Sequence, residues 1–281
     1  MSTTRIPTYF VSHGSPMMAL PNDNEKLTQD FLRDLGKDLL GSGKIKGVVI
    51  CSAHWEEDQN GLQAPRVAVT TARHPELIYD FYGFPHKLYE VEYHAQGSEE
   101  LGKRVQEALT EQNINCDLDN KRGLDHGAWV AAKLMFPDSG PTNETTVPIV
   151  QLSLSSSLDP DFHVAVGKAI KPLRDEGILI LGSGGAVHNL RQLFGPKASW
   201  STGFIEALTE VFTAHGEDRR KGVAALTKLP VFRMAHPRAE HFMPVAVVIG
   251  AADDLEDGTV VHENYPDFAP NLALHAFKVG T

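Results

Sequence analysis

Histidine is the residue type in this sequence most able to do chemistry. The chain has 13 histidines against 3 tryptophans and 6 tyrosines, and imidazole is both the commonest metal ligand and the usual acid or base near neutral pH. Three histidines follow segments expected to be strands, and a fourth precedes one: His13, His54, His188 and His241. Ligands of open α/β sheets bind beyond the carboxyl ends of the strands. If these strands are parallel neighbours, the first three imidazoles converge, which favours a metal site.

The donor type narrows the choice of metal. Imidazole nitrogen suits zinc, iron, copper and nickel, whereas structural zinc usually needs closely spaced cysteines. Neither Cys51 nor Cys116 belongs to a Cys-x-x-Cys pair. Widely spaced histidines are typical of catalytic metals with an open coordination position. Two alternatives remain: the facial site of a non-haem Fe(II) oxygenase, or three histidines around a zinc-bound water.

Other catalytic templates are absent from the sequence. It contains no Gly-x-Ser-x-Gly elbow and no His-Glu-x-x-His motif. Gly43-Lys44 is followed by Ile45, so no P-loop forms, and Gly182-x-Gly184 lacks the third glycine of a dinucleotide fingerprint. The histidines are therefore the strongest indication of function.

The elements that must position these histidines alternate between strand and helix. Apolar, β-branched runs predict strands over Thr8–Ser12, Gly47–Ser52, Arg66–Thr70, Pro148–Leu154, Ile178–Gly182, Pro244–Ile249 and Leu272–Val279. Helical spacing predicts helices over Asn24–Leu40, Ser98–Gln112, His126–Phe136, Pro160–Asp175 and Thr202–His215. The alternation indicates an α/β fold with a mostly parallel or mixed central sheet and helices on both faces. No linker interrupts it, so we expect one catalytic domain over residues 1–281.

Composition excludes several classes of protein and partner. Apolar residues make up 42% and charged residues 22% of the 281 positions, as in ordinary globular proteins rather than disordered chains. A net charge of −10 repels phosphate, so we expect neither nucleic-acid nor membrane partners. Two cysteines cannot build a disulfide framework, and the first ten residues lack the apolar core of a secretory signal. We therefore expect a cytoplasmic protein, while the oligomeric state is not predicted.

Six short motifs occur in order between positions 13 and 244, and together they are more specific than any of them alone. They are His13-Gly14-Ser15-Pro16, Ser52-Ala53-His54-Trp55, Asp80-Phe81-Tyr82-Gly83-Phe84-Pro85, Leu124-Asp125-His126-Gly127-Ala128-Trp129, Val187-His188-Asn189-Leu190 and Glu240-His241-Phe242-Met243-Pro244. The set resembles the class III extradiol ring-cleavage dioxygenases of the 4,5-DOPA dioxygenase type. The wider superfamily includes the protocatechuate 4,5-dioxygenase catalytic subunit and the Memo proteins.

The resemblance implies a role for each histidine of the motifs. His13, His54 and His241 would bind the metal, although some relatives use a glutamate at the third place and Glu240 adjoins His241. His188 would act as the acid or base beside the metal and is also a candidate ligand for zinc. His126 would contact substrate oxygens as a second catalytic residue. The implied substrates are a DOPA-like catechol and O₂, with Fe(II) for turnover and Zn(II) as the alternative bound metal.

Residues beside these histidines have two interpretations each. Ser15, Asp125 and Trp55 are expected to contact substrate. Asp125 would orient the imidazole of His126, or cap the helix that begins there. Trp55 would pack beneath the site, which we favour, or stack on an aromatic ring. The aromatic segment Asp80–Pro85 is a lid or an ordinary surface loop.

The remaining histidines and Trp129 are expected to be structural. Trp129 falls on the first turn of the predicted helix, where a core position is favoured. We assign surface or structural roles to His74, His86, His94, His163, His215, His236, His262 and His275.

Three functions are consistent with these residues. The favoured function is a non-haem, metal-dependent extradiol dioxygenase that cleaves a catechol with O₂. A zinc hydrolase would use the same histidines to activate water. A Memo-like binding protein would keep the fold without turnover, but it would not need an acid or base at His188 and His126.

Overall fold

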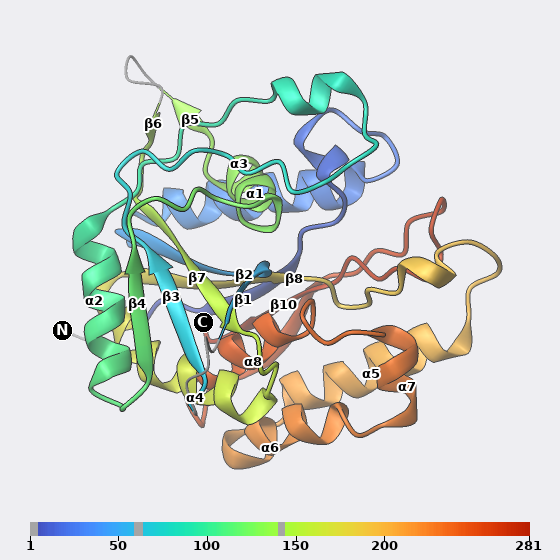
Figure 1. Cartoon of the computed structure of the whole chain (residues 1–281). Helices are drawn as coiled ribbons and strands as arrows, with labels where there is room; N and C mark the ends of the chain where they lie inside the picture. Colours follow the sequence, from blue (N-terminus) through green and yellow to red (C-terminus); the bar gives the residue numbers. More distant parts are fainter. Residues whose placement is uncertain (1–4, 59–63, 140–143) are drawn as a thin grey trace.

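An eight-stranded mixed sheet runs through the computed structural model, which describes residues 5–58, 64–139 and 144–281 (Figure 1). Its strand order is β4-β3-β7-β2-β8-β1-β10-β9. The strands are β1 (Thr8–Ser12), β2 (Gly47–Glu57), β3 (Arg66–Thr70), β4 (Asn115–Asp119), β7 (Ile149–Ser155), β8 (Ile178–Gly184), β9 (Gly258–His262) and β10 (Ala276–Val279). A separate two-stranded ribbon pairs β5 (Asp138–Ser139) with β6 (Glu144–Thr145).

Helices cover both faces of the sheet, as expected. Among the described residues they are α1 (Lys26–Gly41), α2 (Glu99–Thr110), α3 (His126–Met135), α4 (Pro160–Ile170), α5 (Ser199–Thr213), α6 (Gly216–Leu226), α7 (Pro230–Ala235) and α8 (Met243–Gly250). Short 3₁₀ turns occupy Pro16–Ala19, His86–Glu90, Lys171–Glu176 and Leu190–Gln192. Helices α1 and α3 lie on one face, while α4, α6 and α8 lie on the other (Figure 1).

The two faces of the sheet bury two separate apolar clusters. Along β2, Val49 and Cys51 join the cluster under α4 and α8, whereas Val48 and Ile50 join the cluster under α1 and α3. Successive side chains of a strand point to opposite faces, so a strand covered on both sides must be apolar at every position. This is why the central strands read as continuous apolar runs.

The three strands that lead into histidines are adjacent and parallel. β8 lies between β2 and β1 and pairs in parallel with both. The register places Ser52 opposite Ser183 and Ser12 opposite Gly184, so the carboxyl ends of these strands are level. The condition for convergence of the first three imidazoles is therefore met.

The strand predicted over Pro244–Ile249 is wrong, because the segment is helix α8. All eight residues of α8 are buried. A helix that is apolar all round has no polar stripe to show a helical period, and a short β-branched run then resembles a buried strand. His241 consequently lies in a turn before a helix and not at a strand end.

Several boundaries also differ from expectation. The C-terminal strand starts at Ala276 and not at Leu272, while β4, β9, α6 and α7 were missed. The helix expected over Pro160–Asp175 ends as an α-helix at Ile170 and continues as a 3₁₀ helix, because Pro172 has no backbone N–H with which to continue the α-helical hydrogen bonds. None of the helices in the described part of the chain has the length and apolar character that a membrane crossing requires.

Candidate metal centre and active site

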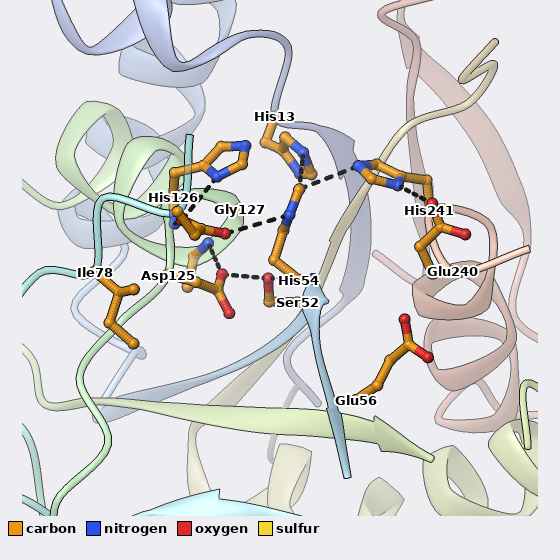
Figure 2. A network of polar contacts seen from close by, with 12 residues as sticks. His13, Ser52, His54, Glu56, Ile78, Asp125, His126, Gly127, Glu240 and His241 are labelled. Carbon is orange, nitrogen blue, oxygen red and sulfur yellow. Dashed lines mark hydrogen bonds and ion pairs between the residues drawn. The ribbon is translucent and has the colours of Figure 1, made fainter. Parts of the chain in front are cut away.

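Three imidazoles turn their Nε2 atoms toward one another at the carboxyl edge of the sheet (Figure 2). The Nε2 of His54 lies 3.3 Å from the Nε2 of His13 and 3.1 Å from the Nε2 of His241. Two nitrogens bound to one ion at about 2.1 Å, with angles of roughly 90–110°, would be about 3.0–3.4 Å apart. The spacing therefore fits shared coordination of one ion.

Three different elements supply these rings. His13 follows β1, and its backbone N–H donates to the carbonyl of Gly184 at 3.1 Å. His54 lies inside β2, where the pairing with β7 breaks between Cys51 and Glu56. Such a bulge redirects side chains, and β2 continues past the expected end at Ser52 to hold this ring.

The loop that carries His241 packs closely against Gly184 at the end of β8. The backbone N–H of Gly185 donates to the carbonyl of His241 at 3.1 Å. A Cβ on Gly184 would lie 2.2 Å from that carbonyl oxygen. A residue without a side chain is therefore needed at this position for the loop to approach the strand.

The Nδ1 atom of each converging ring has an oxygen partner. The Nδ1 of His13 lies 3.1 Å from Ser183 Oγ, and that of His241 lies 3.1 Å from Glu240 Oε1. The Nδ1 of His54 lies 3.4 Å from Asp80 Oδ2. Glu240 accepts a hydrogen bond from His241, and the Asp80 carboxylate faces the Nδ1 of His54 at ion-pair distance. Ser183 donates its own proton to the carbonyl of Gly127. Each Nδ1 therefore carries the proton, which leaves the lone pair on Nε2.

Burial keeps these rings neutral. It lowers the pKa of His54 to about 3 and the pKa values of His13 and His241 well below the usual 6.5, and the neighbouring imidazoles lower the pKa values further. Three neutral rings with converging lone pairs form a donor set that fits a divalent metal. Glu240 lies on the Nδ1 side of His241, away from the converging Nε2 atoms, and orients the ring through its hydrogen bond (Figure 2).

Two further histidines flank the converging three. The ring centroid of His126 lies 3.9 Å from that of His54, and His188 stacks on His241 with centroids 3.4 Å apart and planes 6° apart. Ligand atoms of His126 lie within 4.8 Å of those of His13 and His54, and those of His188 lie equally close to those of Glu240 and His241. Burial, and then His54 and His126, lower the pKa of His188 to about 4.

Asp80 was missed as a functional residue by the sequence analysis. Its Oδ1 accepts from the Nδ1 of His126 at 2.9 Å and from the backbone N–H of the same residue at 2.9 Å, while its Oδ2 faces His54. One carboxylate thus orients two imidazoles and leaves the Nε2 of His126 free. The signal was its position at the start of the aromatic motif, which we interpreted only as a lid or loop.

A cavity of about 430 Å³ opens onto the histidines. It is lined by His13, Gly14, Ser15, Pro16, His54, Phe81, Tyr82, Phe84, His126, Gly184, Gly185, Val187, His188, Leu190, Leu193, His241, Phe268, Leu272 and Leu274. All five histidines named above reach it. Phe81, Tyr82 and Phe84 show that the aromatic segment forms part of the wall.

The other residues expected at the substrate have different positions. Ser15 lines the cavity, and its hydroxyl donates to Glu25 Oε2 at 2.7 Å. Asp125 and Trp55 are not among the lining residues. Asp125 caps α3 by accepting from the backbone N–H of Ala128 at 3.2 Å, and does not orient His126. Trp55 is buried under the guanidinium of Arg122, which confirms packing.

The structural assignments for Trp129 and His236 are confirmed. Trp129 is fully buried in α3. His236 lies among Phe204, Phe232 and Phe242, and its Nε2 is 3.1 Å from the carbonyl oxygen of Ala186.

Comparison with known proteins shows which family this chain belongs to. Residues 7–274 match the family described as the catalytic LigB subunit of aromatic ring-opening dioxygenase. The chain belongs to this family. Among its relatives, the 4,5-DOPA dioxygenase extradiol of Beta vulgaris is 38% identical over 262 residues, covering 92% of this chain and 91% of the relative. The 4,5-DOPA dioxygenase extradiol of Escherichia coli K12 is 34% identical, covering 92% and 90%.

A solved structure agrees with the fold. The crystal structure of an uncharacterized protein from Escherichia coli K12 superposes with a TM-score of 0.78 at 29% identity, covering 98% of this chain and 100% of that one. The predicted α/β fold and the resemblance to class III extradiol dioxygenases are both confirmed. This LigB-family chain is thus a non-haem, metal-dependent ring-opening dioxygenase.

Proposed function

We propose that this enzyme uses Fe(II) and O₂ to open the ring of a catechol, with His13, His54 and His241 as the metal ligands. The observation that carries the proposal is the convergence of three neutral Nε2 atoms at 3.1 and 3.3 Å. Iron is preferred to zinc because the reaction moves electrons from the catechol to O₂, and zinc has no redox chemistry. Bound iron would supply that electronic connection between the two substrates.

The protein's own residues handle protons and exclude water. We assign His188 as the base that takes a catechol proton and later returns it, because it reaches the cavity beside the proposed ligands. His126 would hydrogen-bond a substrate oxygen through Nε2, since Asp80 occupies its Nδ1. Phe81, whose ring centroid lies 5.7 Å from that of His126, and Phe84 line the cavity and would shield it from water. O₂ supplies both inserted atoms, so the reaction needs no external reductant.

Oxygen consumption tests the reaction class. Anaerobic protein loaded with Fe(II) should bind catechol and stop; admitted O₂ should then give one ring-opened product with both added atoms derived from ¹⁸O₂. Turnover without O₂, or label drawn from water alone, would instead support a zinc hydrolase. Zn(II)-loaded protein is the matched control, because zinc suits the same imidazole donors but should give no O₂ uptake.

A substitution at His188 distinguishes its proposed role as a base from a role as a metal ligand. His188→Gln should keep most of the Fe(II) affinity while lowering turnover by about 10²–10⁴-fold. Loss of the metal in this variant would show that His188 is a ligand.

We also propose that residues 1–281 form one catalytic domain and that the enzyme acts in the cytoplasm, in keeping with two buried free cysteines.

A further inference from the structure

The cavity wall combines a few polar side chains with many apolar ones. The polar side chains are the five histidines and Ser15. The other side chains of the wall are mostly aromatic and aliphatic: Phe81, Tyr82, Phe84, Val187, Leu190, Leu193, Phe268, Leu272 and Leu274. Among the residues that the structure describes, the lining contains no aspartate, glutamate, lysine or arginine.

Some of the apolar lining residues reach the protein surface. Tyr82 is 90% exposed, Leu190 62% and Phe268 38%, yet all three line this cavity. They come from three separate segments of the chain, and Phe194, 77% exposed, adjoins the lining residue Leu193. Large apolar side chains gathered at one exposed rim indicate a site that receives apolar groups.

The charged residues nearest the cavity are already engaged elsewhere. Asp80 accepts from His126, Glu25 accepts from Ser15, and Glu240 accepts from His241. Arg191 follows Leu190 in the chain but is exposed and not part of the lining. A carboxylate or ammonium group on the substrate would therefore lose its water without gaining a charged partner, which is costly.

We propose that the substrate is a catechol whose ring carries an uncharged, apolar substituent, held between the aromatic and leucine walls and reaching the rim. The proposal rests on the proposed function, because it assumes that the catechol oxygens lie at the histidines. It separates this chain from the substrate after which its relatives are named, since DOPA carries both a carboxylate and an ammonium group.

Anaerobic binding measures the preference independently of turnover. The probes are catechol, 4-methyl-, 4-ethyl- and 4-propylcatechol, with DOPA and 3-(3,4-dihydroxyphenyl)propionate as charged analogues. Calorimetry on Fe(II)-loaded protein should show affinity rising up to about fourfold per methylene. Both charged analogues should bind at least about tenfold more weakly than 4-propylcatechol, and kcat/KM should follow the same order. Equal or tighter binding of the charged analogues would overturn the inference.

The same experiment distinguishes failure of the inference from failure of the proposed function. If the alkylcatechols bind in the expected order but none consumes O₂, the proposed function fails while the apolar site stands. If DOPA is cleaved best, the function stands and the inference fails.

Two rim variants test the wall itself. Leu190→Arg and Phe268→Arg each place a cation on a partly exposed rim position, from different segments. Each should reduce the preference for 4-propylcatechol over dihydroxyphenylpropionate by about tenfold or more. Leu255→Arg is the control, because Leu255 is 91% exposed and lies outside the lining. An unchanged preference in both rim variants, with the control also unchanged, would show that these walls do not contact the substituent.

Discussion

Gly127→Ala should weaken metal binding, although nothing in the substitution removes a ligand. A Cβ at Gly127 would lie 2.6 Å from Oγ of Ser52, 2.7 Å from Cδ2 of His54 and 3.3 Å from Cε1 of His13. Ordinary contacts of a Cβ begin near 3.4 Å, so either α3 or the side chains of Ser52 and His54 must shift by about 0.7–0.8 Å. Groups that orient metal ligands typically change metal affinity about 10–100-fold when altered, and we expect a loss in that range.

A second glycine in a helix provides the matched control. Gly203 lies in α5, and a Cβ there would meet nothing within 4 Å. Alanine is favoured over glycine in helices by about 1 kcal/mol, so Gly203→Ala should raise the thermal midpoint and leave metal affinity unchanged. Chelator competition with Fe(II) and Zn(II) measures both variants. If Gly127→Ala binds both ions as tightly as Gly203→Ala, the close packing of α3 on the ligands does not constrain the site.

Two more substitutions test hydrogen bonds described above, and a third tests a buried histidine outside the site. Asp80→Asn should lower kcat about 10–100-fold with little change in folding, because a neutral amide is a weaker acceptor for His126 and presents an NH₂ group in place of the oxygen that faces His54; unchanged steady-state kinetics would refute this. Ser183→Ala removes the hydroxyl beside the Nδ1 of His13, so the metal affinity measured by chelator competition should fall at least severalfold. An unchanged affinity would contradict this expectation. Burial lowers the pKa of His163 to about 4, so its neutral form stabilises the fold above pH 6.5 and roughly 3 kcal/mol is lost as the pH falls toward 4. Denaturant titrations should show a shallower pH slope in His163→Gln, and an equal slope would contradict the assignment.

Much of the site could be predicted because its residues follow parallel strands. Once β1, β2 and β8 are adjacent and level, His13 and His54 must approach one another; their places at strand ends predicted this on the condition that the strands are parallel neighbours. His241 was reached through a wrong element: α8 is buried on every side, so its sequence has no helical period and resembles a strand. The motif containing His241 identified this residue as a candidate ligand, but it did not show that the segment after it is a helix.

Asp80 and Asp125 show what local patterns leave out. Asp125 adjoins His126 in sequence, which made it the obvious residue to orient the ring, yet its carboxylate turns to cap α3 and to bind Ser52 at 2.6 Å. The residue that orients His126 is Asp80, 46 positions away. Hydrogen bonds between residues distant in sequence depend on how the loops run over the edge of the sheet. Neither the hydrophobic periodicity nor the spacing of residues in the sequence predicts the course of those loops.

The wide separation of the converging histidines along the chain has a consequence for assembly. His13 and His54 are 41 residues apart, and His54 and His241 are 187 apart. Closing such long loops costs conformational entropy that a single ion would have to offset before the sheet exists. We therefore expect the metal to bind after the sheet has formed, unlike the ion of a small zinc domain, which folds with its metal. An ion that binds only the folded chain would raise the free energy of unfolding by RT ln(1 + [metal]/Kd).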